Sequence, residues 1–257
     1  MDLEYRIVIQ QVGQHRFIEQ GQGPVLLVLH GLFGALSNFT HVLDHFSKEY
    51  KVVIPLMPIY DLPLKKTNVP SLAEYIHSFI QDRGYTSITL LGNSLGGHVS
   101  LVYTVKYPKH VKALVLTGSS GLYENAFGGS FPRREDRNYI RKKVETTFFD
   151  PVNATEELID EVFGIINDKA KLFRILAIAK SAIRHNMREE LPSISIPVCL
   201  IWGRNDTVTP PEVAEEFNEL LPDSSLFWIN ACGHAPMMEH PLEFNAILDP
   251  WMRANVL

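Results

Sequence analysis

The sequence is poor in cysteine and lacks long apolar runs. Its 257 residues include only two cysteines, Cys199 and Cys232, which are too few for a disulfide scaffold. A membrane-spanning helix needs about 18 or more consecutive apolar residues, and the chain has no such run. The first residues, MDLEYRIVIQQ, include acidic side chains and alternate apolar with polar ones, whereas a secretory signal has a basic stretch and an apolar block. We therefore expect a cytoplasmic protein with no membrane partner.

Basic residues and cofactor motifs are also scarce. Lys and Arg total 24 against 29 Asp and Glu, a formal net charge of -5, so a nucleic-acid partner is not expected. The sequence has no G-x-G-x-x-G and no Walker motif, so we expect no nucleotide cofactor. His41 and His45 are four apart, but no carboxylate or Cys accompanies them at ligand spacing, and we interpret them as surface or packing residues rather than metal ligands. The expected partner is a small-molecule substrate, and the oligomeric state stays open.

Short apolar runs, by contrast, are abundant and regularly spaced. Apolar residues make up 46% of the chain and charged residues 21%, close to the average of globular proteins. At roughly 150 residues per domain, this length corresponds to one large domain or to one domain that carries an insertion.

The spacing of these runs predicts an α/β fold. Apolar and polar residues alternate at 5–10 and 15–19, which predicts an N-terminal antiparallel hairpin. Buried strands are expected at 24–29, 51–54, 87–91, 111–116, 196–202 and 225–229. Helices are expected at 38–49, 71–83 and 95–107, after Pro210-Pro211, and from about residue 241. Buried strands that alternate with amphipathic helices are typical of a doubly wound, mostly parallel sheet.

Residues 121–190 interrupt this alternation. They contain no convincing strand and show helical periodicity. The apolar residues at helical spacing include Leu172, Ile175, Leu176, Ala179 and Ile183. The simplest interpretation is one α/β core, formed by residues 1–120 and 191–257, with a helical insertion at 121–190 after the sixth strand.

The strongest motif is Gly92-Asn93-Ser94-Leu95-Gly96-Gly97, between an expected strand and an expected helix. It matches the G-x-S-x-G nucleophile elbow in the context that gives this motif meaning. A serine on so sharp a turn has strained backbone angles, and glycine at 92 and 96 avoids collisions of side chains there. A Gly/Ser turn without chemistry is the alternative. We predict Ser94 as a catalytic nucleophile.

Two further residues would complete a catalytic triad. A serine hydroxyl is a poor nucleophile unless a base activates it. Asp206, in the motif WGRND, and His234, in ACGH, each follow an expected strand. The order Ser94, Asp206, His234 is the one that α/β hydrolases use, and the carboxyl ends of parallel strands meet at one edge of the sheet. We predict that Asp206 orients His234, which serves as general base and then general acid.

An oxyanion hole is expected from two backbone amides. The N–H of Leu95 lies at the start of the helix after Ser94, where positive potential favours a developing anion. The segment His30-Gly31-Leu32-Phe33-Gly34 follows the first central strand, and a loop there can direct the Leu32 N–H toward the same oxygen. His30 itself is interpreted as a structural residue that holds the loop by a hydrogen bond.

These motifs together resemble the α/β-hydrolase superfamily, and the resemblance covers essentially the whole chain. They are HG at 30–31, GNSLGG at 92–97, WGRND at 202–206, CGH at 232–234 and EHP at 239–241. The motifs around Ser94, Asp206 and His234 resemble those of meta-cleavage-product hydrolases, which cleave carbon–carbon bonds in vinylogous diketones. The segment HGLFG instead resembles small carboxylesterases. Dehalogenase and epoxide-hydrolase relatives use an Asp nucleophile, so Ser94 argues against both.

The sequence also departs from the carbon–carbon hydrolases. Many of them have a small, Gly-rich segment after HG and an aromatic residue after the catalytic His, whereas Leu32-Phe33 and Ala235 occupy those places here. The resemblance further implies that residues 121–190 form the helical cap over the site. Its aromatic residues could line a pocket for an apolar substrate or pack within the cap itself. They are Phe127, Phe131, Phe148 and Phe149.

The leading hypothesis is a serine hydrolase that needs no cofactor and no metal. It would act through an acyl-enzyme on a small or medium, largely apolar carboxylic ester. One alternative is a carbon–carbon hydrolase of the meta-cleavage-product type. The other, from a different class, is a ligand-binding protein on the same fold without useful turnover, because a fold alone does not fix a function.

Overall fold

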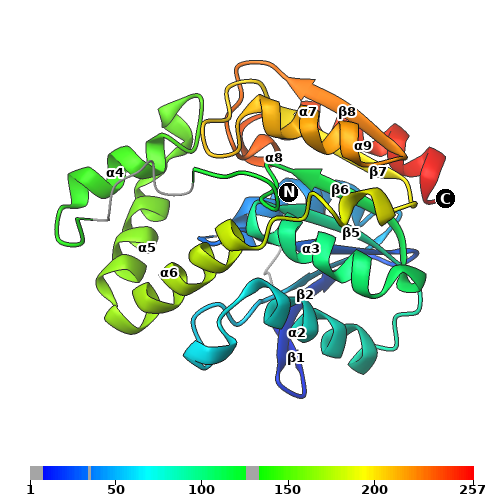
Figure 1. Cartoon of the computed structure of the whole chain (residues 1–257), viewed down its shortest axis with the longest axis horizontal. Helices are drawn as coiled ribbons and strands as arrows, with labels where there is room; N and C mark the ends of the chain where they lie inside the picture. The colour runs from blue at the N-terminus through cyan, green and yellow to red at the C-terminus, as the bar shows by residue number, and fades with distance from the viewer. Residues whose placement is uncertain (1–7, 34–35, 126–132) are drawn as a thin grey trace, which may run out of the picture.

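A computed structural model describes residues 8–33, 36–125 and 133–257 of the chain. Within these ranges an eight-stranded sheet runs through the molecule in the order β1-β2-β4-β3-β5-β6-β7-β8, with helices on both faces (Figure 1). The strands are β1 Gln10–Val12, β2 His15–Gln20, β3 Val25–Leu29, β4 Lys51–Pro55, β5 Ile88–Asn93, β6 Val111–Thr117, β7 Val198–Gly203 and β8 Ser224–Ile229. Strands β3 to β8 are parallel to one another, and β2 runs antiparallel to both β1 and β4. The predicted fold class is confirmed.

The first strand of the N-terminal hairpin differs from the prediction in its bounds. The first strand begins at Gln10, and Val12 pairs with His15. Val8 and Ile9 lie outside the strand, and residues 1–7 lie outside the described residues. The two-residue connection needs a positive φ, which Gly13 supplies at 55°. The turn therefore fixes the pairing and moves the strand toward it from the predicted 5–10.

Two apolar clusters fill the space between the sheet and its helices. The helices of the α/β core are α1 Thr40–Phe46, α2 Val69–Asp82, α3 Leu95–Lys106, α7 Pro211–Leu220, α8 Pro236–Glu239 and α9 Pro241–Asn255, with short 3-10 turns at Leu36–Phe39, Leu64–Lys66, Pro108–His110, Pro151–Asn153 and Leu191–Ser193. One cluster joins α2, α3 and α7 to the sheet, and we call it the α2/α3 cluster. The other, the α1/α9 cluster, joins α1 and α9 to it. Leu114 and Val115 of β6 are both buried but belong to different clusters, because successive strand residues point to opposite faces. Burial on both faces explains the continuous apolar runs in the sequence.

Three helices are inserted between β6 and β7. They are α4 Arg137–Glu145, α5 Glu156–Asn167 and α6 Lys169–Arg184, and we call them the inserted helices. Each begins at a residue whose side chain accepts hydrogen bonds from backbone N–H groups of the first turn. These residues are Asp136, Thr155 and Asp168. The inserted helices extend beyond one end of the strands, at the left of Figure 1.

The inserted helices share their apolar side chains with the core. Ile140 of α4 and Ile159 of α5 belong to the α1/α9 cluster, whereas Ile178 of α6 belongs to the α2/α3 cluster. In addition, the Val69 N–H at the start of α2 donates to the Ser181 hydroxyl of α6 at 3.2 Å. The insertion is thus packed against both sides of the sheet end rather than standing apart from it.

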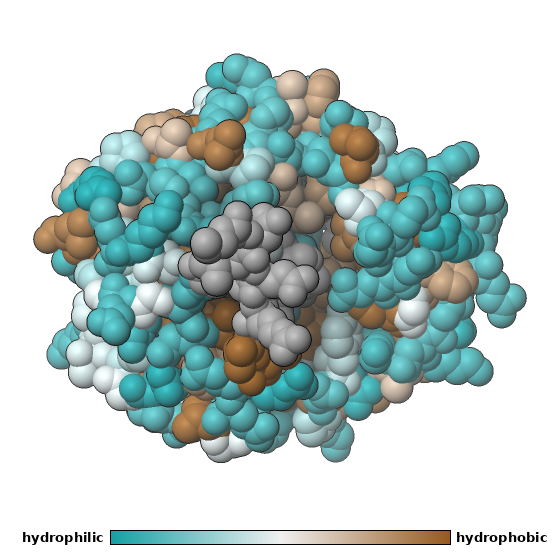
Figure 2. All heavy atoms as spheres, turned by 180° about the vertical axis from the view of Figure 1, so that it is seen from behind, coloured by the Kyte–Doolittle hydropathy of each residue, from teal (hydrophilic) through white to brown (hydrophobic). Residues whose placement is uncertain are grey.

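The surface is mostly polar on the face seen in Figure 2, with hydrophobic side chains scattered across it. Exposed apolar residues that are dispersed in this way are normal for a globular protein. In the part of the chain that the structure describes, no helix combines the length and the apolar character needed to cross a bilayer.

Candidate active site

Ser94 lies at the sharp turn between β5 and α3. Its φ of 53° and ψ of -119° place a non-glycine residue in a sparsely populated region of backbone space, a strain that is often found at functional sites. A Cβ atom at Gly92 would lie 2.5 Å from the Gly96 carbonyl oxygen, and one at Gly96 would lie 2.0 Å from that of Leu29. Only glycine fits at both positions, so the G-x-S-x-G spacing is a packing requirement of this turn.

Asp206 and His234 come into direct contact, although 28 positions separate them. Asp206 follows β7 and His234 follows β8, and the two strands pair in parallel. The imidazole Nδ1–H donates to Asp206 Oδ2 at 2.8 Å. Both residues are buried, with exposed fractions of 3% for Asp206 and 6% for His234. The Nε2 of the imidazole is therefore the atom left to act on a substrate.

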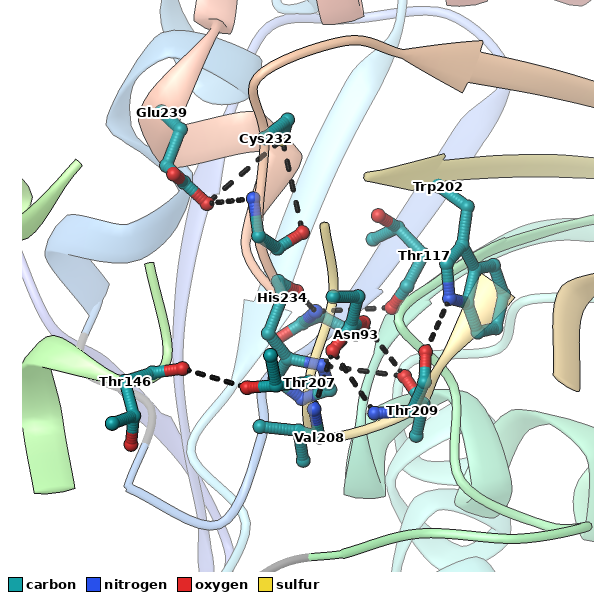
Figure 3. Close-up of polar contacts among 12 residues, drawn as sticks. Asn93, Thr117, Thr146, Trp202, Thr207, Val208, Thr209, Cys232, His234 and Glu239 are labelled. Atoms are coloured by element: carbon teal, nitrogen blue, oxygen red, sulfur yellow. Dashed lines mark hydrogen bonds and ion pairs between the residues drawn. The ribbon is translucent and has the colours of Figure 1, made fainter. Parts of the chain in front are cut away.

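Three donors besides the imidazole hold the Asp206 carboxylate. The backbone N–H groups of Val208 and Thr209 donate to Oδ1 at 2.8 and 2.9 Å, and the Thr209 hydroxyl donates to Oδ2 at 2.8 Å. The Thr209 carbonyl in turn accepts from the Trp202 indole at 2.9 Å. Figure 3 shows this group around His234. These hydrogen bonds fix the orientation of the Asp206 carboxylate toward the imidazole.

The charge of Asp206 controls the pKa of His234. Burial alone would lower this pKa, because it disfavours the charged imidazolium. The charge and the hydrogen bond of Asp206, together with the charges of Glu124 and Glu239, outweigh burial, so that the pKa of His234 lies above its ordinary value. The imidazole is consequently well suited to hold a proton that it has taken from a nucleophile.

The backbone around His234 is held by segments from elsewhere in the chain. Its N–H donates to the Thr147 carbonyl at 2.8 Å, and its carbonyl accepts from the Asn93 amide at 3.2 Å. Glu239 of α8 accepts from the Gly233 N–H at 2.8 Å with one oxygen and from the Phe149 N–H at 2.7 Å with the other. The inserted segment at 147–149 and the histidine loop are therefore joined through one carboxylate, part of which is drawn in Figure 3.

A pocket of about 460 Å³ brings the predicted site residues together. Ser94, His234, Leu32 and Leu95 all line it. Among the described residues, no hydrogen bond joins the Ser94 hydroxyl to the imidazole; such bonds are often long until substrate binds. Most of the other lining residues are apolar, and many of these come from the inserted helices. They include Ile140, Val144, Leu158, Val162, Ile166, Ile178, Ala179 and Ala182.

Hydrogen bonds from Tyr60 and His30 hold the loop that carries Leu32. The Tyr60 hydroxyl donates to the Leu32 carbonyl at 3.2 Å. His30 is buried; its Nδ1–H donates to the Gly31 carbonyl at 2.9 Å, and its Nε2 accepts from the Met57 N–H at 3.4 Å. These contacts agree with the structural role expected for His30. The contribution of the Leu32 and Leu95 amides to an oxyanion hole stays a prediction.

The aromatic residues of the insertion divide between several places. Phe148 is buried and lines the pocket, whereas the side chain of Phe149 is 49% exposed. Phe127 and Phe131 lie outside the described residues. Cys232, two positions before His234, is buried in the α1/α9 cluster, and burial raises the pKa of its thiol. A buried thiol of high pKa is a weak nucleophile.

Sequence reasoning missed two acidic residues near His234. One is Glu239, which the sequence indicated only as part of a resemblance. The other is Glu124, which lines the pocket in the loop after β6. Burial raises the pKa of Glu124 to about 7, although the nearby imidazole of His234 acts in the opposite direction. Glu124 belongs to no motif, so no local signal could have identified it, and the EHP motif at 239–241 did not indicate the contacts that Glu239 makes.

Comparison with known proteins agrees with this geometry. Residues 24–150 and 166–241 match the family described as alpha/beta hydrolase fold. The chain belongs to the α/β-hydrolase family. Lipase 3 of Moraxella sp. (strain TA144) is 29% identical over 84% of this chain and 73% of its own.

Two further relatives of this α/β hydrolase are informative. The 2-hydroxy-6-oxo-6-(2'-aminophenyl)hexa-2,4-dienoic acid hydrolase of Metapseudomonas resinovorans is 29% identical over 91% of this chain and 86% of its own. The solved structure of MGS-MChE2, an α/β hydrolase enzyme from the metagenome of lagoon sediments of Mar Chica, Morocco, is 45% identical. It superposes with a TM-score of 0.81 over 97% of this chain and 100% of its own. The relatives are hydrolases, and so is this chain.

Proposed function

We propose that this hydrolase cleaves carboxylic esters by a serine mechanism. Ser94 Oγ attacks the ester carbonyl as His234 Nε2 takes its proton, and the Leu32 and Leu95 amides stabilise the negative oxygen. His234 then gives the proton to the departing alcohol, which leaves an acyl-enzyme. A water activated by His234 attacks the acyl carbonyl, releases the acid and restores Ser94.

The observation that carries the proposal is the buried contact of 2.8 Å between Asp206 and His234, at the pocket that Ser94 also lines. The pocket wall is largely apolar, and the inserted helices supply many of its apolar residues, which favours an apolar acyl group of small or medium size. We further propose that the inserted helices act as a cap over this site. The lipase relative supports an ester substrate.

The first test uses Ser94→Ala on a panel of p-nitrophenyl esters of increasing chain length. The variant should lose activity by at least about 10³-fold, because the triad then has no nucleophile. Ser193→Ala, at an exposed position outside the pocket, serves as the matched control and should keep its activity. Circular dichroism would show that both variants fold. A folded Ser94→Ala that kept a tenth of wild-type turnover would contradict the mechanism.

A fluorophosphonate probe tests the same site without a substrate. It should label Ser94 in the wild type, and His234→Ala should suppress the labelling because the hydroxyl loses its base. Folded wild-type protein that fails to react would argue instead for a ligand-binding protein without turnover.

A carbon–carbon hydrolase is the second candidate, supported by the Metapseudomonas relative. Leu32 and Phe33 at the pocket, and Ala235 after His234, favour esters. Assays of an ester and a vinylogous diketone on one preparation separate the two candidates by their ratio of kcat/KM.

A further inference from the structure

Among the described residues that line the pocket, Glu124 is the only acidic one. The described residues include no Lys or Arg in an ion pair with it. A side-chain hydrogen bond with Ser120 satisfies only part of its capacity, and a carboxyl that is largely removed from water is costly to keep without further partners. Its position at the pocket wall therefore points to a ligand group that would satisfy it.

The loop that bears Glu124 is fixed to the catalytic segments at both ends. The Ser120 N–H donates to the Ser94 carbonyl at 3.2 Å, and the Asn125 N–H donates to the Val208 carbonyl at 2.7 Å. Farther back on the loop, a Cβ atom at Gly118 would lie only 2.9 Å from His234 Nδ1. The loop of Glu124 is thus attached to the Ser94 turn at one end and to the segment that follows Asp206 at the other.

This position corresponds to the leaving-group side of the proposed reaction. His234 delivers its proton to the departing alcohol, so the alcohol must lie beside the imidazole. Glu124 is close enough for its charge to raise the pKa of His234. An alcohol held by His234 would therefore lie next to the Glu124 carboxyl, while the apolar residues of the inserted helices would surround the acyl chain.

We propose that Glu124 binds a free hydroxyl on the alcohol half of the ester, so that this enzyme selects esters of hydroxylated alcohols. The inference rests on the proposed esterase function and names the substrate class for that site. Asn125 and Thr207 also line the pocket and add uncharged polar groups to it.

A hydroxyl suits this carboxyl better than a cation does. Near neutral pH both forms of Glu124 are populated, because its pKa is about 7. A hydroxyl can donate to the carboxylate and accept from the carboxylic acid, whereas an ammonium group binds only the carboxylate. Hydroxyl binding is consequently available to both forms.

The test compares two esters of the same acid that have equal numbers of heavy atoms, a 2-hydroxyethyl ester and a propyl ester. The wild type should favour the hydroxyethyl ester in kcat/KM by roughly five- to tenfold, the effect of one hydrogen bond. Glu124→Leu should bring the ratio close to one. Glu124→Gln should keep most of the preference, because its amide oxygen still accepts. Glu157→Gln, on the exposed side of α5 and outside the pocket, is the matched control and should keep both the ratio and the rates.

Two outcomes would overturn the assignment. If Glu124 is merely structural, Glu124→Leu will slow both esters equally and leave their ratio unchanged. If the carboxylate recognises charge, a choline ester will exceed its neutral 3,3-dimethylbutyl analogue, and Glu124→Gln will abolish that preference while leaving the two uncharged esters alike.

Failure of the esterase proposal has a different signature. Wild-type protein would then neither react with a fluorophosphonate nor hydrolyse either ester. The same ester pair is in that case compared as ligands by calorimetry. A preference for the hydroxyethyl ester that Glu124→Leu removes would support the binding role, and equal affinity would refute it.

Discussion

At the scale of single residues, we expect Asp206 to determine the pH range in which His234 acts as a base. The base must be neutral, so activity should rise as the pH increases through the pKa of His234. Asp206→Asn removes the charge that raises this pKa and leaves burial, which lowers it. We expect the acidic limb of kcat/KM to move to lower pH, while kcat falls by about 10³- to 10⁴-fold because the orienting carboxylate is lost.

This prediction is best measured in a Glu124→Gln background, because Glu124 titrates in the same range. The profile is recorded with the propyl ester from pH 5 to 9, with and without Asp206→Asn. An acidic limb that stays in place or moves to higher pH would show that Asp206 does not govern the base.

At the scale of elements, Glu239 connects α8, the histidine loop and the segment that follows α4. Its two oxygens accept from Gly233 and Phe149. Glu239→Gln keeps one acceptor but turns an NH₂ group toward the other N–H donor. We expect a loss of about 1 kcal/mol in the free energy of unfolding, which is the typical contribution of one hydrogen bond, and a fall in kcat of about tenfold because His234 is less well placed.

Urea unfolding and ester kinetics measure the two effects of Glu239→Gln. Glu215→Gln, at an exposed position on α7, is the control and should match the wild type in both. Loss of stability with an unchanged kcat would contradict the positioning role.

The sequence was a good guide to the elements of the core and a poorer one to the contacts between them. The prediction for β6 is confirmed, because an uninterrupted apolar run has few alternatives to a strand buried on both faces. Helix α8 was not predicted, since its four residues, Pro236–Glu239, are too few to show periodicity. The boundaries of the inserted helices were likewise left open.

Some residues of the candidate site could likewise be predicted from the sequence, and others could not. Ser94, Asp206 and His234 were predicted because each follows a strand in a recognisable motif, and their catalytic roles stay predictions. Glu124 and Glu239 could not be found from the sequence. Glu239, for example, acts on a backbone N–H that is 90 positions away, and such a contact leaves no local pattern.

At the scale of the whole molecule, the shared apolar clusters predict cooperative unfolding. Side chains of the inserted helices belong to both clusters of the core, so the insertion has no separate apolar interior to melt alone. We expect one thermal transition at which near-UV circular dichroism, calorimetry and fluorophosphonate reactivity all change together. An early transition confined to residues 137–184 would contradict this expectation.

The two hydrogen bonds that join residues 146–147 to the loops of Thr207 and His234 have a consequence for engineering. These bonds connect the part of the pocket wall formed by Thr146 and Thr147 directly to the loop of the proposed base. Replacing residues 146–147 to admit bulkier substrates should therefore also change the position and the pKa of the His234 imidazole. We expect such variants to differ from the wild type in both substrate selectivity and pH optimum.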